Sequence, residues 1–226
     1  MNVILDGPRM PPARGGKPDA LVVQLHGYGS NGADLISLAP YWAKALPGAA
    51  FVSPNAIESV PQAPGGYQWF PITQLNPDLM ESGARAASGS LDRFIDRELE
   101  RYGLDNSRPG ARRLQPRRDD GALCRAPRKL QPAAILGYSG VLVGGRKLKD
   151  EVTKSARPSC SSTATRIRPS RSPAMFESGE ALCAAGLSAQ WHVSYGIPHS
   201  IGPDGLELGG AFLATYLKAQ KILAAR

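Results

Sequence analysis

The chain has 226 residues, a formal net charge of +8 and a hydrophobic fraction of 42%, which favours one globular domain over a disordered or repetitive protein. No apolar run approaches the length of a bilayer and the N-terminus lacks the pattern of a signal peptide, so we expect a cytoplasmic protein with no integral membrane association. The three cysteines show neither disulfide nor zinc-ligand spacing, so we expect free thiols and no metal site.

The positive charge is concentrated in two stretches. Residues 109–125 hold five arginines against two aspartates, and residues 159–173 hold three arginines and no acid. Neither stretch has the aromatic interleaving or the helical spacing that is typical of a nucleic-acid surface. We therefore expect no nucleic-acid partner, and a basic nucleic-acid-binding protein is the weakest of the alternatives considered.

The predicted elements alternate between strands and helices after an irregular arm over residues 1–19. In chain order they are a strand at 21–25, a helix at 34–46, a strand at 50–54, a helix at 91–102, a strand at 133–138, a helix at 174–185, a strand at 190–195 and a helix at 206–219. This alternation predicts an α/β fold, with a mainly parallel sheet covered by helices on both faces. We expect a single domain over residues 1–226.

Two loops beside predicted strands carry groups that suit catalysis. The sequence HGYGSNG from His26 follows a buried strand, and its backbone N–H groups could stabilise an oxyanion. His199 lies between the last strand and the last helix, where an imidazole could act as a general base. Taken alone, a glycine turn is usually only a turn and a loop histidine is usually a solvated or structural residue. His192, inside a strand, is expected to be structural.

Four segments extend this pattern: LHGYGSNGADL (25–35), GGYQWFPI (65–72), GYSG (137–140) and HVSYGIPHSIGPDG (192–205). Together they resemble the carboxylesterase/phospholipase family of α/β-hydrolases, which is related to acyl-protein thioesterases. The resemblance implies a serine hydrolase of carboxylic esters, lysophospholipids or thioesters that needs no cofactor. It also implies that His199 is the catalytic histidine, that the Tyr28 backbone N–H is an oxyanion donor, and that Trp69 and Phe70 line the acyl pocket.

Two members of the catalytic triad are missing from the expected places. The family has its serine in a G-x-S-x-G elbow and its aspartate after another buried strand. The chain instead has PGARRLQPRRDDGAL from Pro109 and SCSSTATRIRPSRSP from Ser159. Ser139 is an alternative nucleophile, but Val141 replaces the second glycine of the elbow, and the family has a GYSG-like strand end in addition to its elbow.

The genetic code offers an explanation for both gaps. Dropping the first base of the codons for residues 109–123 permits LALVGFSQGGTMAL, whose serine straddles Gln115 and Pro116. A shift across residues 158–167 permits VLLVHGDAD, whose second aspartate straddles Arg166 and Ile167. We therefore hypothesise two short, compensated frameshifts, in the gene or in its reading, and an enzyme that is inactive as written. A non-catalytic relative that binds acyl ligands is the alternative.

The frameshift hypothesis carries a structural expectation. Arginine and proline suit the interior of a buried parallel sheet poorly, because an unpaired buried charge is costly and proline lacks a backbone donor. We therefore expect irregular, exposed or poorly packed chain at residues 112–120 and 160–171, disrupting the central strands.

Overall fold

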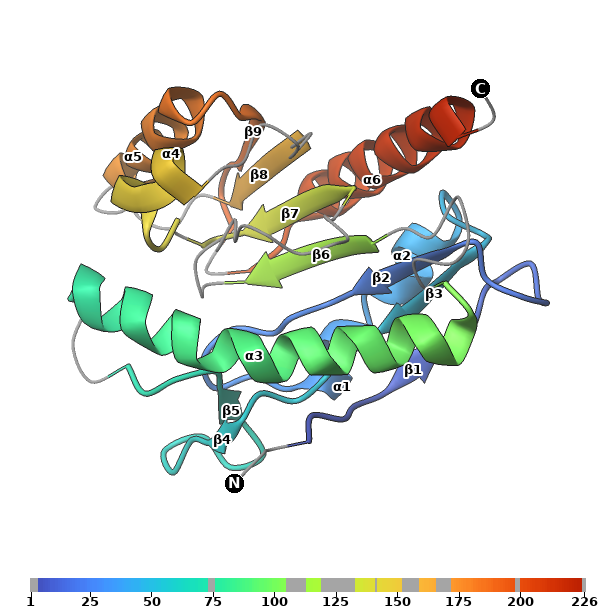
Figure 1. Cartoon of the computed structure of the whole chain (residues 1–226), viewed down its shortest axis with the longest axis horizontal. Helices are drawn as coiled ribbons and strands as arrows, with labels where there is room; N and C mark the ends of the chain where they lie inside the picture. Colours follow the sequence, from blue (N-terminus) through green and yellow to red (C-terminus); the bar gives the residue numbers. More distant parts are fainter. Residues whose placement is uncertain are drawn as a thin grey trace. The chain divides into compact units, whose positions relative to one another are not determined.

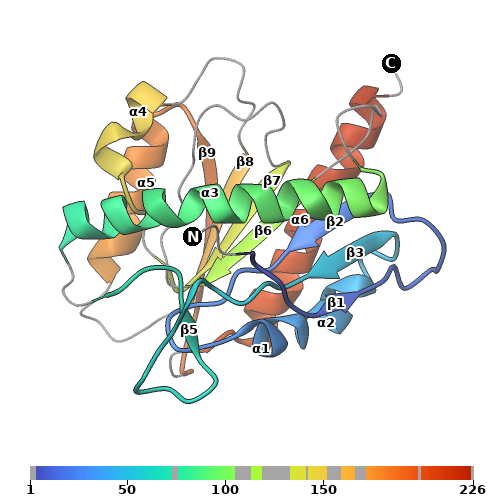
Figure 2. The ribbon, with the colours of Figure 1, turned by 60° about the horizontal axis from the view of Figure 1, so that its bottom comes forward.

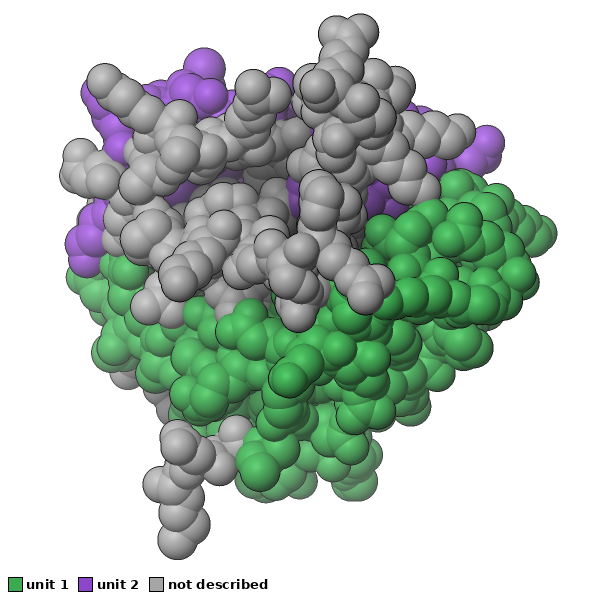
Figure 3. Space-filling model, turned by 45° about the vertical axis from the view of Figure 1, so that its right-hand side comes forward, with its two compact units in different colours: residues 1–112 green, residues 113–226 purple. Residues whose placement is uncertain are grey.

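The computed structural model describes residues 4–72, 76–104, 113–118, 133–140, 142–151, 159–165, 172–197 and 200–224. The chain divides into two compact units, Met1–Arg112 and Arg113–Arg226 (Figure 3). The single domain expected from length stays a prediction, and each unit is described by itself.

Three paired strands belong to the first unit (Figure 1). Strands β2 (Ala20–Val23) and β3 (Ala49–Val52) are parallel, and β1 (Arg9–Met10) pairs antiparallel with β3. Every residue of β2 and β3 is buried, as expected for strands covered on both faces. Within the arm predicted as irregular, Arg9 and Met10 form a strand, because their backbone pairs with the N–H and C=O groups along one edge of β3. Residues 4–8 and 11–19 form neither a helix nor a strand.

A buried ion pair also holds the arm. The Arg9 guanidinium donates to both carboxylate oxygens of Glu98, at 2.8 and 2.7 Å, and Glu98 is only 1% exposed. The hydrogen bond to this carboxylate raises the pKa of Arg9 above its ordinary value. This bidentate contact connects β1 to the long helix α3 (Pro77–Tyr102).

The helix predicted at 34–46 is two short helices, α1 (Gly32–Ile36) and α2 (Ala39–Ala43). The Asn31 side chain accepts from the Asp34 N–H and so caps α1. Pro40 lies in the first turn of α2, where its missing N–H costs little, whereas inside one continuous helix it would remove a hydrogen bond. Proline therefore explains why the predicted helix is divided.

Helix α3 begins at Pro77 rather than at the predicted Leu91. Asn76 caps it by accepting from the Asp78 and Leu79 N–H groups, and Gly103 ends it in a left-handed conformation with φ of 59°. The turns from residue 81 to residue 90 consist mostly of Ala, Ser and Gly. They lack the apolar stripe that periodicity analysis requires, so only the end signals could have predicted their helical state.

The second unit contains four parallel strands, shown side by side in Figure 2. In spatial order they are β6 (Arg113–Arg118), β7 (Ala134–Tyr138), β8 (Ser159–Thr165) and β9 (Ser188–Ser194). Of the two stretches expected to be irregular, exposed or poorly packed, the described parts 113–118 and 160–165 are strands, so the expected irregularity is wrong there. That these parts are exposed or poorly packed stays a prediction. Residues 112, 119–120 and 166–171 lie outside the described residues. A parallel ladder uses backbone N–H and C=O groups, which every residue except proline supplies in full.

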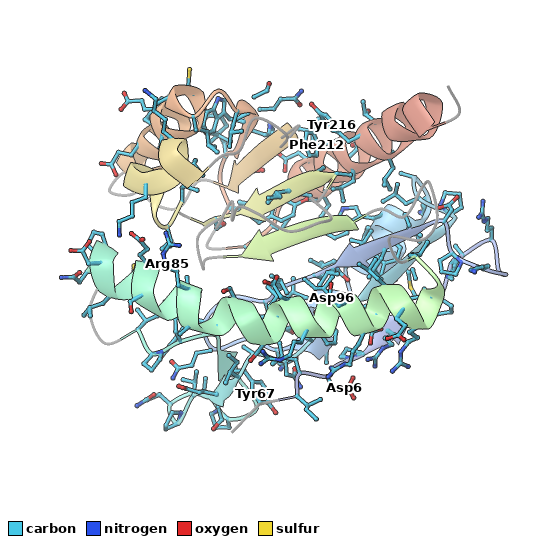
Figure 4. All side chains as sticks on the ribbon, viewed as in Figure 1. Asp6, Tyr67, Arg85, Asp96, Phe212 and Tyr216 are labelled. Atoms are coloured by element: carbon cyan, nitrogen blue, oxygen red, sulfur yellow. The ribbon has the colours of Figure 1, made fainter. Side chains whose placement is uncertain are left out.

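Alternating side chains on β7 contact helices on the two faces of this sheet. Ile135 belongs to an apolar cluster with Leu148 of α4 (Leu148–Glu151) and Leu182 of α5 (Ser172–Ala184). Tyr138, at an alternate position, donates its hydroxyl to Gly205 O at 3.0 Å at the start of α6 (Pro203–Ala224). Within α6 the Phe212 and Tyr216 rings lie 4.6 Å apart (Figure 4). The α/β class predicted from the sequence is confirmed.

Candidate active site

The glycine turn that follows β2 is tied to its neighbours on both sides. At its base the fully buried Gln24 donates from Nε2 to Leu35 O at 2.8 Å, joining the end of β2 to α1. Further along, the Gly29 N–H donates to Tyr67 O at 3.0 Å and the Tyr67 N–H donates to Ser30 O at 2.8 Å. Tyr67 belongs to β5 (Tyr67–Gln68), which pairs with β4 (Glu58–Ser59) (Figure 4). Gly29 has a φ of 74°, a conformation that glycine adopts without strain.

The His26 ring holds the turn from the inside. Its Nδ1 lies 2.8 Å from Gly27 O and its Nε2 accepts from the Ala56 N–H at 2.9 Å. A carbonyl only accepts and an amide N–H only donates, so the imidazole carries its single proton on Nδ1. Burial lowers the pKa of His26, which also favours the neutral ring.

Tyr28, the predicted oxyanion donor, lies at the tip of this turn. Its side chain is half-exposed, and its backbone N–H makes no hydrogen bond to any of the described residues. A backbone donor that is left unpaired in a turn braced by its neighbours can stabilise an oxyanion without reorganising. The role of the Tyr28 N–H nevertheless stays a prediction.

Trp69 and Phe70, the predicted pocket residues, are both buried within the first unit. The Trp69 indole donates from Nε1 to His26 O at 2.9 Å, and its ring centroid lies 5.6 Å from that of His26. Phe70 packs against Gly83 of α3, where an added Cβ would lie only 2.6 Å from the ring. Trp69 therefore braces the turn and Phe70 fixes α3, while their role in an acyl pocket stays a prediction.

Ser139, at the end of β7, has an unusual local environment. It has a φ of 54° and is the one non-glycine residue with a positive φ in the described part of the chain. Its hydroxyl oxygen is buried and has no hydrogen-bond partner among the described residues. Left-handed backbone in a residue with a Cβ costs on the order of 1 kcal/mol.

His192, expected to be structural, contacts a carboxylate that sequence analysis missed. Its Nε2 lies 2.6 Å from Asp204 Oδ2, and the Ser194 hydroxyl donates to Asp204 Oδ1 at 2.8 Å. The hydrogen bond with His192 is the main cause that lowers the pKa of Asp204 to about 2. Asp204 lies in the first turn of α6, where negative charge is favoured. The sequence Gly-Pro-Asp at 202–204 signals this helix start but not the partners of the aspartate.

The contact between His192 and Asp204 joins the end of β9 to the start of α6, the two elements on either side of the loop that contains His199. His199 itself lies outside the described residues. Among the residues that are described, no cluster of three or more histidines, cysteines, aspartates or glutamates could hold a metal ion.

Comparison with known proteins identifies the family. The model of the phospholipase/carboxylesterase family matches residues 12–108. The crystal structure of esterase PE8 is 30% identical, superimposes with a TM-score of 0.82, and aligns over 95% of this chain and 100% of that chain. The chain belongs to the phospholipase/carboxylesterase family. By family it is a carboxylic ester hydrolase with the α/β-hydrolase fold, as the sequence motifs predicted.

Less similar structures agree on the fold. Acyl-protein thioesterase 2 from Zea mays is 16% identical with a TM-score of 0.64 and aligns over 92% of this chain and 97% of that chain. A carboxylesterase from Mesorhizobium loti is 18% identical with a TM-score of 0.67 and aligns over 89% and 91%. Across the described helices of the present chain, none is long and apolar enough to cross a membrane.

Proposed function

We propose that this chain derives from a serine hydrolase of carboxylic esters, lysophospholipids or thioesters, and that it is inactive as written. In the active form a serine attacks the acyl carbonyl, and His199 takes the serine proton and passes it to the leaving group. The Tyr28 N–H stabilises the oxyanion, and Trp69 and Phe70 line the acyl pocket. Water then releases the acyl group, with His199 again acting as base and then as acid.

The observation that carries this proposal is the braced turn in a member of this family. The Tyr28 N–H is unpaired among the described residues, while the bonds of Gly29 and His26 hold the chain on either side of it. Such a turn supplies transition-state stabilisation only if a nucleophile generates an oxyanion beside it. The elbow serine and the aspartate are absent from the sequence where the family has them. We therefore infer that the chain keeps the oxyanion turn but lacks the residues that would generate an oxyanion beside it. The cytoplasmic location expected from sequence stays a prediction.

Restoring both reading frames tests the proposal. We expect the restored protein to hydrolyse p-nitrophenyl acetate, and the chain as written to hydrolyse it no faster than its His199→Ala variant. Loss of a triad nucleophile typically lowers kcat by on the order of 10⁶, so recovery would be unmistakable. A restored chain that folds and lacks activity on short acyl esters would remove the assignment. Sequencing the coding DNA across both stretches tests the frameshifts directly.

Ser139 is a second candidate nucleophile, because strained backbone and an unpaired hydroxyl coincide there. Both features are typical of functional sites. The test is the rate of the chain as written against Ser139→Ala. A wild-type rate clearly above both the Ser139→Ala and His199→Ala rates would assign turnover to Ser139.

A non-catalytic acyl-binding relative is the remaining alternative. It predicts saturable binding of a lysophospholipid by the chain as written, with no turnover before or after both frames are restored. Turnover by the restored chain separates the two proposals.

A further inference from the structure

We infer that the neutral His26 imidazole is a positioning residue that holds the Tyr28 turn in place, and that acid releases the turn by protonating this ring. The inference deepens the proposed function, on which its catalytic meaning rests. The structural claim, that the ring fixes the turn, can be tested on its own.

The first step of the argument is the position of the ring. His26 is fully buried at the start of the turn, and its two ring nitrogens bond to different parts of the unit. Nδ1 contacts Gly27 O, inside the turn, and Nε2 contacts the Ala56 N–H, beyond the end of β3. One side chain therefore joins the turn after β2 to the segment after β3.

The second step is that the backbone of the same residue bonds to a third segment. His26 O accepts from the Trp69 indole N–H at 2.9 Å, just after β5. Gly66, on the approach to β5, can come close only without a side chain, because a Cβ there would collide with Gly29 O. Three segments far apart in sequence thus converge on His26, and Tyr28 lies two residues away.

The third step is that these contacts require one protonation state. An imidazolium carries hydrogen on both ring nitrogens, so protonation would direct a second N–H at the Ala56 N–H, 2.9 Å away. Two donors cannot bond to each other. The ring must then rotate or leave its site, and either movement breaks the link to Ala56 and frees the turn.

The surroundings supply little to stabilise a charged ring. The exposed Asp34 carboxylate of α1 raises the pKa of His26 through its negative charge. The Tyr67 ring of β5 lies edge-on to the imidazole, with 6.3 Å between the two ring centroids. The segment from Ser53 to Ala56 carries no ionisable side chain. Burial outweighs Asp34 and lowers the pKa of His26. The neutral-ring geometry is therefore kept at neutral pH and lost on acidification.

Native-state hydrogen exchange on the chain as written tests the inference. The reporters are the Ala56 amide, which bonds to the ring, and the Gly29 amide, which bonds to Tyr67 O. We expect their protection factors to fall by at least about tenfold from neutral pH to about pH 4.5, after correction for intrinsic exchange. The Leu104 amide, bonded to Leu99 O at the end of α3, is the internal control and should change by less than about twofold.

Two variants separate acid release from general acid sensitivity. His26→Gln keeps an acceptor for the Ala56 N–H and cannot take up a proton in this range, so it should keep its protection at low pH. His192→Gln removes a histidine from the other unit and should behave as wild type. Equal loss of protection in wild type and His26→Gln, or no loss in wild type, would overturn the inference.

A second measurement on the wild type keeps the test decisive if His26→Gln does not fold. The chain has three histidines, so their side-chain ¹⁵N signals can be assigned. His26 should show the Nδ1–H tautomer at neutral pH and leave it together with the loss of Ala56 protection. An Nε2–H tautomer at neutral pH would overturn the inference. Absence of esterase activity after frame restoration would remove the proposed function and leave these results unaffected.

Discussion

Strands β2 and β6 show how little a backbone ladder demands of side chains. Strand β2 has the sequence ALVV, is wholly buried, and runs into a turn that the His26 ring and the His26 carbonyl bond to two other segments. Strand β6 has the sequence RLQPRR and still pairs in register with β7. A parallel ladder can thus form in a sequence that does not suit a buried core. Backbone pairing alone therefore does not show that a strand belongs to a packed core, because the core depends on the side chains.

The largest expected effect comes from making β6 and β8 resemble β2. Restoring both frames removes the three arginines of β6, which becomes part of the run GFSQGG, and replaces the serine-rich start of β8 with apolar residues of the run VLLVHGDAD. An unpaired charge inside a parallel sheet costs several kcal/mol, and apolar side chains favour burial there. We expect the free energy of unfolding, measured by urea denaturation, to rise by about 5 kcal/mol or more. Equal unfolding midpoints for the two chains would show that β6 and β8 accommodate the written sequence, and the comparison with β2 would fail.

The next effect tests whether the first unit carries the well-packed core. Phe51 of β3 is completely buried, so Phe51→Ala should lower the free energy of unfolding by about 3–5 kcal/mol. Tyr41→Ala, at a side chain that is 63% exposed, is the control and should change it by less than about 0.5 kcal/mol. Similar small losses for both variants would mean that the β2–β3 core is not tightly packed.

A smaller effect is expected where the arm joins α3. Glu98→Gln leaves the Arg9 guanidinium partly buried without its carboxylate, which should cost about 1–3 kcal/mol in urea denaturation. Asp6→Asn also removes a partner of Arg9, but the Asp6 side chain is 74% exposed, so it should cost less than about 1 kcal/mol. Equal losses of unfolding free energy in the two variants would contradict the claim that the buried contact between Arg9 and Glu98 fixes β1.

The smallest effect concerns Asp204 in the second unit. Its pKa is lowered to about 2, chiefly by the hydrogen bond with His192. Its contribution to the free energy of unfolding is therefore fully present at pH values above the ordinary pKa of an aspartate, and it is lost as the pH falls through about 2. Asp204→Asn should remove this part of the pH dependence of the unfolding midpoint below about pH 4. If the unfolding midpoint of the variant depends on pH in the same way as that of the wild type, the contact with His192 does not contribute to stability.

Sequence patterns were sufficient where each signal is local or specific to the family. Apolar runs predicted β2 and β3. The four motif segments, of which the first runs from Leu25 to Leu35, predicted the family, which the comparisons confirmed. The start of α3 was missed because its first turns lack an apolar stripe, although Asn76 and Pro77 mark its beginning. The role assigned to His199 stays a prediction.

What only the tertiary structure decided is which polar groups meet. The sequence motif contains His26, but nothing local shows that its ring bonds to Ala56 or that its carbonyl accepts from Trp69. Asp204 likewise meets His192 only because β9 and α6 bring residues twelve positions apart together. Periodicity reports burial, whereas the partner of a buried polar atom depends on how distant segments converge.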